Sequence, residues 1–188
     1  MQAENAHARE LIGEIDRMRH RARARASVMW FPLVLFGMLS VASAFVSARY
    51  GGQALGPYWM VAGPAGGVAT AVAAYRRGRR VGVSVPGVPY LAVAVFILVG
   101  ASAAGWAGDA LGEHALSAVG PPIVVSIGYL LFARLERSRP LTWTAVGLAA
   151  LAVGLLATGI EPEPMAVILA LVYGATFIAT GLFLWGRR

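Results

Sequence analysis

The sequence contains no cysteine and no lysine, and its longest apolar stretches contain no charged residue at all. Without cysteine the chain has no disulfide framework and no thiolate ligand for zinc, haem or an iron–sulfur cluster. Charged residues make up 13% of the chain and apolar residues 58%. A soluble domain carries about 25% charged residues, so this composition excludes an ordinary soluble globule, and its hydrophobicity excludes disorder.

Six apolar stretches are long enough to cross a lipid bilayer, which requires about 20 residues in a helix. Because they are apolar on every side, they differ from the amphipathic helices of a soluble all-α protein. The stretches cover residues 28–47, 58–75, 90–107, 115–133, 141–159 and 165–185. The sequence therefore predicts an all-α, polytopic membrane protein, with a domain of six transmembrane helices over residues 28–188 arranged as three hairpins.

The arginines lie almost entirely on one side of this predicted topology. The termini and the second and fourth connections hold 15 of the 16 arginines. The other side has only Arg49, together with the acids Asp109, Glu113, Glu161 and Glu163. The positive-inside rule therefore predicts a multi-pass protein of the inner, cytoplasmic cell membrane with both termini in the cytoplasm.

Residues 1–27 predict a cytoplasmic, basic amphipathic helix ahead of the first span. Leu11, Ile15, Met18 and Ala22 recur at helical spacing and share one face. Such a helix can lie on the bilayer with its arginines against anionic lipid headgroups, or the arginines can simply anchor the first span. The arginines predicted to contact lipid headgroups or a cytoplasmic protein partner are Arg17, Arg19, Arg21, Arg23 and Arg25. No nucleic-acid recognition fold accompanies them, so we expect no nucleic-acid partner.

Two of the predicted spans contain glycine–proline interruptions at corresponding positions. When the first arginine after each even-numbered span is aligned, Pro64 and Pro122 fall into register. Proline removes a backbone donor, so both helices should bend at matching depth and face each other. Such interruptions are typical of transporter binding sites, and bending for packing is the alternative. The predicted ligand cavity comprises Gly63, Pro64, Pro121, Pro122, Ser126 and Tyr129.

Polar groups inside the predicted spans are hydroxyls, among them those of Tyr173, Thr176 and Thr180. They suit a neutral or lipophilic ligand, or hydrogen bonds between helices. Small residues at spacings of four, as in Gly63 and Gly67, also permit close helix approach, within the chain or in a homo-oligomer. Further series of this kind are Ala150 with Gly154, and Ala166 and Ala170 with Gly174.

Catalytic motifs are absent, with no Walker loop, no HExxH and no GxGxxG. We therefore predict a protein that is not an enzyme and that has no catalytic residue, cofactor or metal. One cluster invites a second interpretation, because Asp109 and Glu113 are four residues apart and precede His114. On one helical face these side chains could hold a divalent cation, although a solvated connector is the commoner role.

The stretch from Ala8 to Arg17, the Arg/Ala run after it and Trp30-Phe31-Pro32 resemble a loose group of small six-span membrane proteins of high-GC actinobacteria. This resemblance implies a cell-membrane location and brings no activity or site residue with it. Two classes of function remain open. The first is a non-enzymatic accessory, sensor or scaffold component; the alternative is a small transporter or permease subunit for a neutral or lipophilic substrate.

Overall fold

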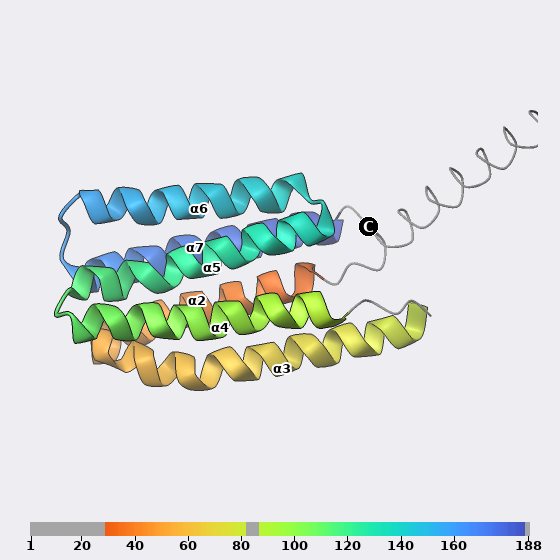
Figure 1. Ribbon diagram of the computed structural model, residues 1–188, viewed down its shortest axis with the longest axis horizontal. Coiled ribbons are helices and arrows are strands. Elements are labelled where there is room, and N and C mark those ends of the chain that lie inside the picture. Colours follow the sequence, from red (N-terminus) through yellow and green to blue (C-terminus); the bar gives the residue numbers. More distant parts are fainter. Residues whose placement is uncertain (1–28, 82–86, 187–188) are drawn as a thin grey trace, which may run out of the picture.

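A computed structural model describes residues 29–81 and 87–186, and these ranges are built from helices without any strand. Successive long helices run back and forth as one elongated bundle (Figure 1). They are α2 (Trp30–Tyr50), α3 (Leu55–Val81), α4 (Gly87–Ala110), α5 (His114–Glu136), α6 (Arg139–Ala157) and α7 (Pro162–Gly186), with a short 3-10 turn η1 (Gly52–Ala54) before α3. The all-α prediction is confirmed for this part of the chain. The predicted helix over residues 1–27, with its arginines, lies outside the described residues.

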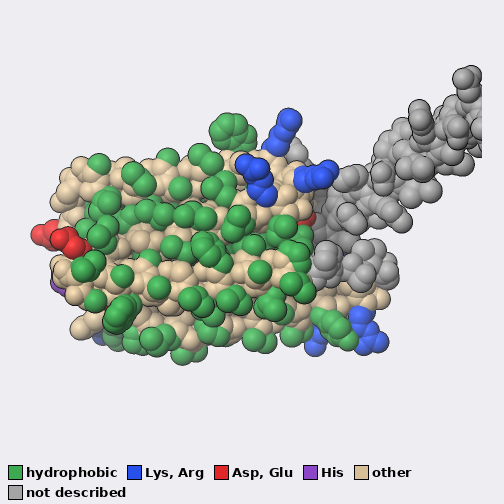
Figure 2. All heavy atoms as spheres, in the orientation of Figure 1, with side chains coloured by type: hydrophobic (Ala, Val, Ile, Leu, Met, Phe, Trp, Pro, Cys, Tyr) green, Lys and Arg blue, Asp and Glu red, His purple; other side chains and the backbone are tan. Residues whose placement is uncertain are grey.

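Five helices, α2, α4, α5, α6 and α7, are long and apolar enough to cross a membrane. Large apolar side chains cover the outside of the bundle, including Phe45 and Val99, which are 69% and 60% exposed. Figure 2 shows apolar side chains spread over the whole visible length of the bundle between its two ends. A water-soluble bundle would not expose so continuous an apolar surface, so these helices are suited to lie among lipids.

Helix α3 differs from the predicted second span in length and composition. It continues past residue 75 to Val81, so that Arg76, Arg77 and Arg79 belong to the helix rather than to a connection. Its apolar part is also diluted by glycines and by Pro64. Because of this dilution α3, although 27 residues long, is not among the five helices that reach the hydropathy expected of a span.

Helices α2 and α7 form the most extensive contact, and two facing glycines allow it. A Cβ atom added at Gly174 would lie 2.8 Å from the carbonyl oxygen of Gly37, and one added at Gly37 would lie 2.8 Å from the carbonyl oxygen of Gly174. The two backbones therefore touch directly, as in membrane helix pairs that meet at small residues. Gly174 belongs to one of the three small-residue series predicted from the sequence. Gly67 and Gly154 belong to the other two series, and a Cβ atom added at either position would meet nothing within 4 Å.

Helices α4 and α5 form a second close pair, again along small residues. Gly120 lies against Ala104, Gly108 against the backbone of Ser117, and Gly128 against the side chain of Ile97. Helix α5 also packs on α6 and α7, so it occupies a central place in the bundle. Helix α3 is peripheral and is held to α2 by the Tyr58 hydroxyl, which donates to the carbonyl oxygen of Leu39 at 2.8 Å.

Candidate functional site

The two proline segments lie inside continuous helices that do not pack against each other. Helix α3 packs on α2 and sparsely on α4, whereas α5 packs on α4, α6 and α7 (Figure 1). Pro64 is exposed and the nearest neighbour of Gly63 is Leu98 of α4, while Pro121 faces Gly105 on another part of α4. The expectation that the prolines face each other is therefore wrong, because α4 and α5 form their own close hairpin. Pro122, Ser126 and Tyr129 are brought together instead with α7.

A buried polar cluster joins α5, α6 and α7 around the hydroxyl group of Tyr173. This oxygen lies 2.9 Å from Oγ of Ser126, 2.9 Å from the carbonyl oxygen of Leu148 and 3.2 Å from the carbonyl oxygen of Pro122. A phenol has one hydrogen to donate, so the shorter bond to Leu148 leaves Ser126 as the donor to Tyr173. The cluster is thus satisfied internally, which is what a buried polar network requires.

Tyr129 lies next to this cluster and contributes its ring rather than its hydroxyl. The centroids of the Tyr129 and Phe177 rings are 4.5 Å apart, and both side chains are buried. Among the described residues the Tyr129 hydroxyl makes no hydrogen bond. Of the six residues predicted to line a cavity, Ser126 and Tyr129 are therefore part of the packed interior between α5 and α7.

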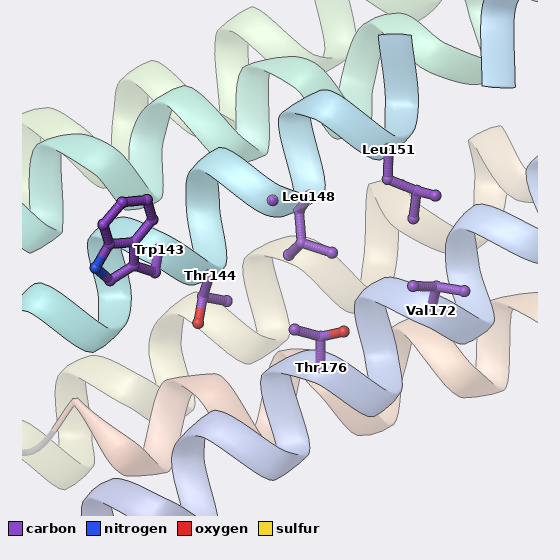
Figure 3. Close-up of a pocket in the computed structure, with 7 residues that line it drawn as sticks. Trp143, Thr144, Leu148, Leu151, Val172 and Thr176 are labelled. Carbon is purple, nitrogen blue, oxygen red and sulfur yellow. The ribbon is translucent and has the colours of Figure 1, made fainter. Parts of the chain in front are cut away.

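A groove opens instead between α6 and α7, where the two helices contact each other sparsely. Its volume is about 360 Å³. Figure 3 shows Thr144, Leu148 and Leu151 directed from α6 toward α7, with Val172 and Thr176 directed from α7 toward α6. The residues that line it are Trp143, Thr144, Gly147, Leu148, Leu151, Val172 and Thr176.

The groove is apolar apart from two threonine hydroxyls and the indole of Trp143. Thr144 is linked to Thr180 by a hydrogen bond of 3.1 Å, which ties α6 to α7 near one end of the groove. At the same end Trp143 is 75% exposed. Gly147 and Val172 are also exposed, so the groove opens on the outer surface of the bundle. With no ionisable lining residue, its chemistry suits an apolar ligand.

Thr176 is recognisable from the sequence as an in-span hydroxyl, whereas the groove is not. The sequence feature that could have indicated the groove is Gly147, which has no side chain and lies one turn beyond Trp143 on α6. A Cβ atom added at Gly147 would meet nothing within 4 Å. Whether such a gap becomes a groove depends on how far α7 lies from α6, and that distance is set by tertiary packing.

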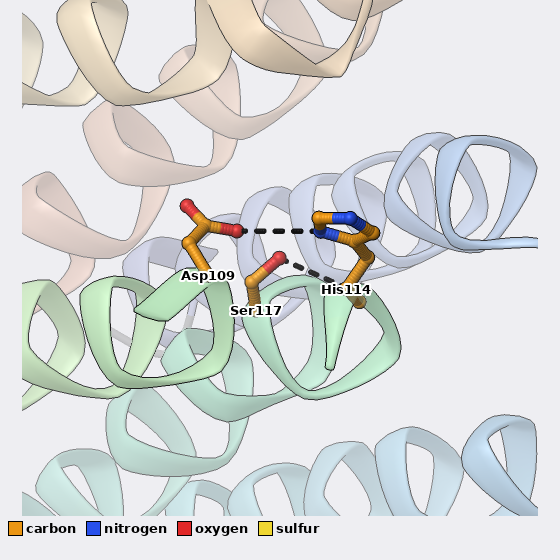
Figure 4. Close-up of polar contacts among 3 residues, drawn as sticks. All are labelled: Asp109, His114 and Ser117. Carbon is orange, nitrogen blue, oxygen red and sulfur yellow. Dashed lines mark hydrogen bonds and ion pairs between the residues drawn. The ribbon is translucent and has the colours of Figure 1, made fainter. Parts of the chain in front are cut away.

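The acidic turn at the opposite end of the bundle does not form the shared helical face that the alternative, metal-binding interpretation requires (Figure 4). Helix α4 ends at Ala110 and Gly112 has a φ of 72°, so Asp109 and Glu113 do not share a helical face. Nδ1 of His114 lies 3.8 Å from Oδ1 of Asp109, with the two side chains 70% and 66% exposed. In the described ranges no three His, Cys, Asp or Glu residues are placed to hold a metal. A contact this exposed contributes little to stability, and the turn has the features of a solvated connector.

The other end of the bundle is basic. Residues 134–140 contain three arginines and one acid, Glu136. Oε1 of Glu136 accepts a hydrogen bond of 2.6 Å from the hydroxyl of Tyr90 at the start of α4. The Tyr90 ring stacks on Phe132 with the centroids 5.9 Å apart, which fixes the start of α4 against the end of α5. The carboxylate of Glu136 is therefore directed to α4 rather than to α6.

No protein-family model matches the sequence, and neither a curated protein nor a solved structure is significantly similar to it.

Proposed function

We propose that this protein is a non-enzymatic accessory or sensor component of the cell membrane, which acts by holding a lipophilic molecule in the groove between α6 and α7. The observation that carries the proposal is the groove itself, an uncharged depression of about 360 Å³ on an apolar surface. A ligand that enters from the lipid phase needs no aqueous path. It would report on the composition of the surrounding membrane through contacts with two helices at once.

The packing of the interior favours this role over transport. Leu33, Val119, Met165, Leu169 and Phe177 are almost fully buried at the centre of the bundle. The hydroxyls of Ser126 and Tyr173 bind each other, and the Tyr173 hydroxyl also binds the backbone carbonyl of Leu148. A transporter for a neutral substrate is the alternative, and it would need a path between helices. The separated proline segments, on which that alternative rested, do not supply such a path.

The proposal includes six membrane crossings with both termini in the cytoplasm. Arginines lie at the C-terminal end of α3 and in the α5–α6 turn, whereas Asp109, Glu113, Glu161 and Glu163 lie at the opposite end. Figure 2 shows the blue basic side chains mainly at one end of the bundle, and the red acidic ones of the facing surface mainly at the other. If the positive-inside rule holds, the arginine-rich end is cytoplasmic and α3 crosses the membrane beside α2.

Cysteine labelling tests this orientation without background, because the chain contains no native cysteine. A Gly78→Cys variant should not react with an impermeant maleimide added to intact cells, and it should react after the membrane is permeabilised. A Leu111→Cys variant, in the exposed turn after α4, is the matched control and should react in intact cells. Labelling of Gly78→Cys from outside would contradict the proposed orientation.

Photochemical labelling tests the groove as a ligand site. Full-length protein in phosphatidylcholine vesicles is irradiated with a long-chain alcohol that carries a diazirine group, and labelled peptides are identified by mass spectrometry. We expect the label on the segments 143–151 and 172–176. Gly147→Leu should reduce that labelling several-fold, because the new side chain occupies the groove.

Gly154→Leu is the matched control for this experiment. Gly154 lies on the same helix, also has no neighbour within 4 Å, and does not line the groove. The two variants gain helix propensity equally, so a difference between them reports on the groove alone. Equal labelling of the two variants would overturn the groove as the ligand site.

A further inference from the structure

Four residues of α6 form a row that leads from the groove to the basic end of the bundle. Arg139, Trp143, Gly147 and Leu151 follow one another at spacings of four, so they form one ridge that is inclined to the helix axis. Trp143, Gly147 and Leu151 line the groove. Arg139 is exposed and stands one turn beyond Trp143, about 6 Å along the helix axis, where the groove ends.

Within residues 29–81 and 87–186, no acidic side chain neutralises the positive charge of Arg139. Among the described residues it forms no ion pair, and Arg137, two residues earlier, is also exposed without one. The nearest acid in sequence is Glu136, whose carboxylate accepts the hydrogen bond from Tyr90 on α4. The end of the groove is therefore a cationic position beside an uncharged, apolar channel, with an indole between the two.

The order of cationic, aromatic and apolar groups along this row matches one class of molecule. A guanidinium group binds a phosphate through two parallel hydrogen bonds, and tryptophan is favoured at the level of lipid headgroups. Beyond the tryptophan the groove accepts only apolar groups, over about 12 Å of helix from Trp143 to Leu151. We propose that the occupant is an anionic phospholipid, with its phosphate at Arg139 and one acyl chain along Gly147 and Leu151. This inference rests on the function proposed above and names the ligand of that site.

A second copy of the chain fits the groove less well. Copies inserted in the same orientation and related by a two-fold axis would bring residues of equal depth together. Contact along this row would place Arg139 against Arg139 of the other copy, without an acid between them. A phospholipid brings the opposite charge to the same position.

The test compares two photoreactive phospholipids that carry the same diazirine acyl chain and differ in the headgroup, phosphatidylglycerol and phosphatidylcholine. Full-length protein is reconstituted in vesicles that contain both, and labelling of segments 143–151 and 172–176 is measured for each. We expect phosphatidylglycerol to label these segments about fivefold more, the factor that one arginine near an anionic surface provides. Arg139→Gln should bring the ratio close to one.

Arg76→Gln is the matched control, because Arg76 is an exposed arginine at the same end of the bundle on α3, which is remote from α6. It should leave the ratio unchanged. A ratio of one in the wild-type protein, or an unchanged ratio in Arg139→Gln, would overturn the anionic lipid and leave the groove intact as a ligand site. Failure of Gly147→Leu to reduce labelling by either lipid would overturn the groove as well. A disulfide-linked dimer of Gly147→Cys in native membranes would overturn the lipid in favour of a second copy.

Discussion

Replacement of Gly174 by leucine is expected to destabilise the protein more than any other single change considered for this chain. A Cβ atom at this position would lie 2.8 Å from the carbonyl oxygen of Gly37 and 2.6 Å from Cγ2 of Val41. Overpacking in a well-packed core costs about 1–3 kcal/mol. Here the obstacle is backbone on the facing helix, which cannot change rotamer, so we expect about 3 kcal/mol.

The measurement is the thermal unfolding of purified variants in detergent, followed by intrinsic tryptophan fluorescence. Gly174→Ala adds only the Cβ atom and should lower the melting temperature by a smaller amount. It therefore provides a measurement even if the leucine variant does not fold. Gly154→Leu is the control, since nothing lies within 4 Å of that position. A melting temperature of Gly174→Leu equal to that of Gly154→Leu would contradict the direct backbone contact of α2 and α7.

Much of the fold could be predicted because it follows from local composition. Each of the six apolar stretches lies largely within one helix, and the connections fall where charge, glycine and proline interrupt the apolar pattern. The exact ends are less predictable, because nothing local stops a helix such as α3 from continuing through its arginines to Val81. The pairing of helices was beyond prediction, since Gly37 and Gly174 are far apart in the chain and either could have faced lipid.

The candidate site shows where such prediction stops. Alignment of Pro64 with Pro122 placed both prolines at the same depth in their predicted spans. Equal depth does not determine which helices are neighbours. The Tyr173 hydroxyl was one of several in-span hydroxyls, and its partners Ser126 and Leu148 are 47 and 25 residues away. The groove depends on the distance between α6 and α7, which no residue of either helix determines alone.

The second large effect is expected when Tyr173 becomes phenylalanine. This change keeps the ring and removes the oxygen atom that joins α5, α6 and α7 through hydrogen bonds. Hydrogen bonds between membrane helices contribute about 0.6 kcal/mol on average and up to about 1.7 kcal/mol. Because Tyr173 contacts three partners and Ser126 would lose its acceptor in a buried position, we expect a loss of about 1–2 kcal/mol.

Tyr129→Phe makes the same chemical change one turn from Ser126, at a buried side chain whose hydroxyl makes no hydrogen bond among the described residues. It should leave the melting temperature nearly unchanged, so the difference between the two variants isolates the hydrogen bonds from the rings. Ser126→Ala completes a double-mutant cycle with Tyr173→Phe, and a coupling energy near zero would contradict the direct bond.

The Tyr173→Phe variant also tests whether the buried cluster shapes the groove. Leu148 offers its carbonyl oxygen to Tyr173 and its side chain to the groove lining, so α6 is held at this point by the residue that shapes the groove. Without the Tyr173 hydroxyl, α6 loses its hydrogen bond to α7 at this level, while the hydrogen bond between Thr144 and Thr180 still joins the two helices. We therefore expect Tyr173→Phe to alter photochemical labelling of segments 143–151 and 172–176, while Tyr129→Phe leaves it as in the wild type. Unaltered labelling in Tyr173→Phe, alongside the expected loss of stability, would mean that the cluster holds the bundle together without shaping the groove.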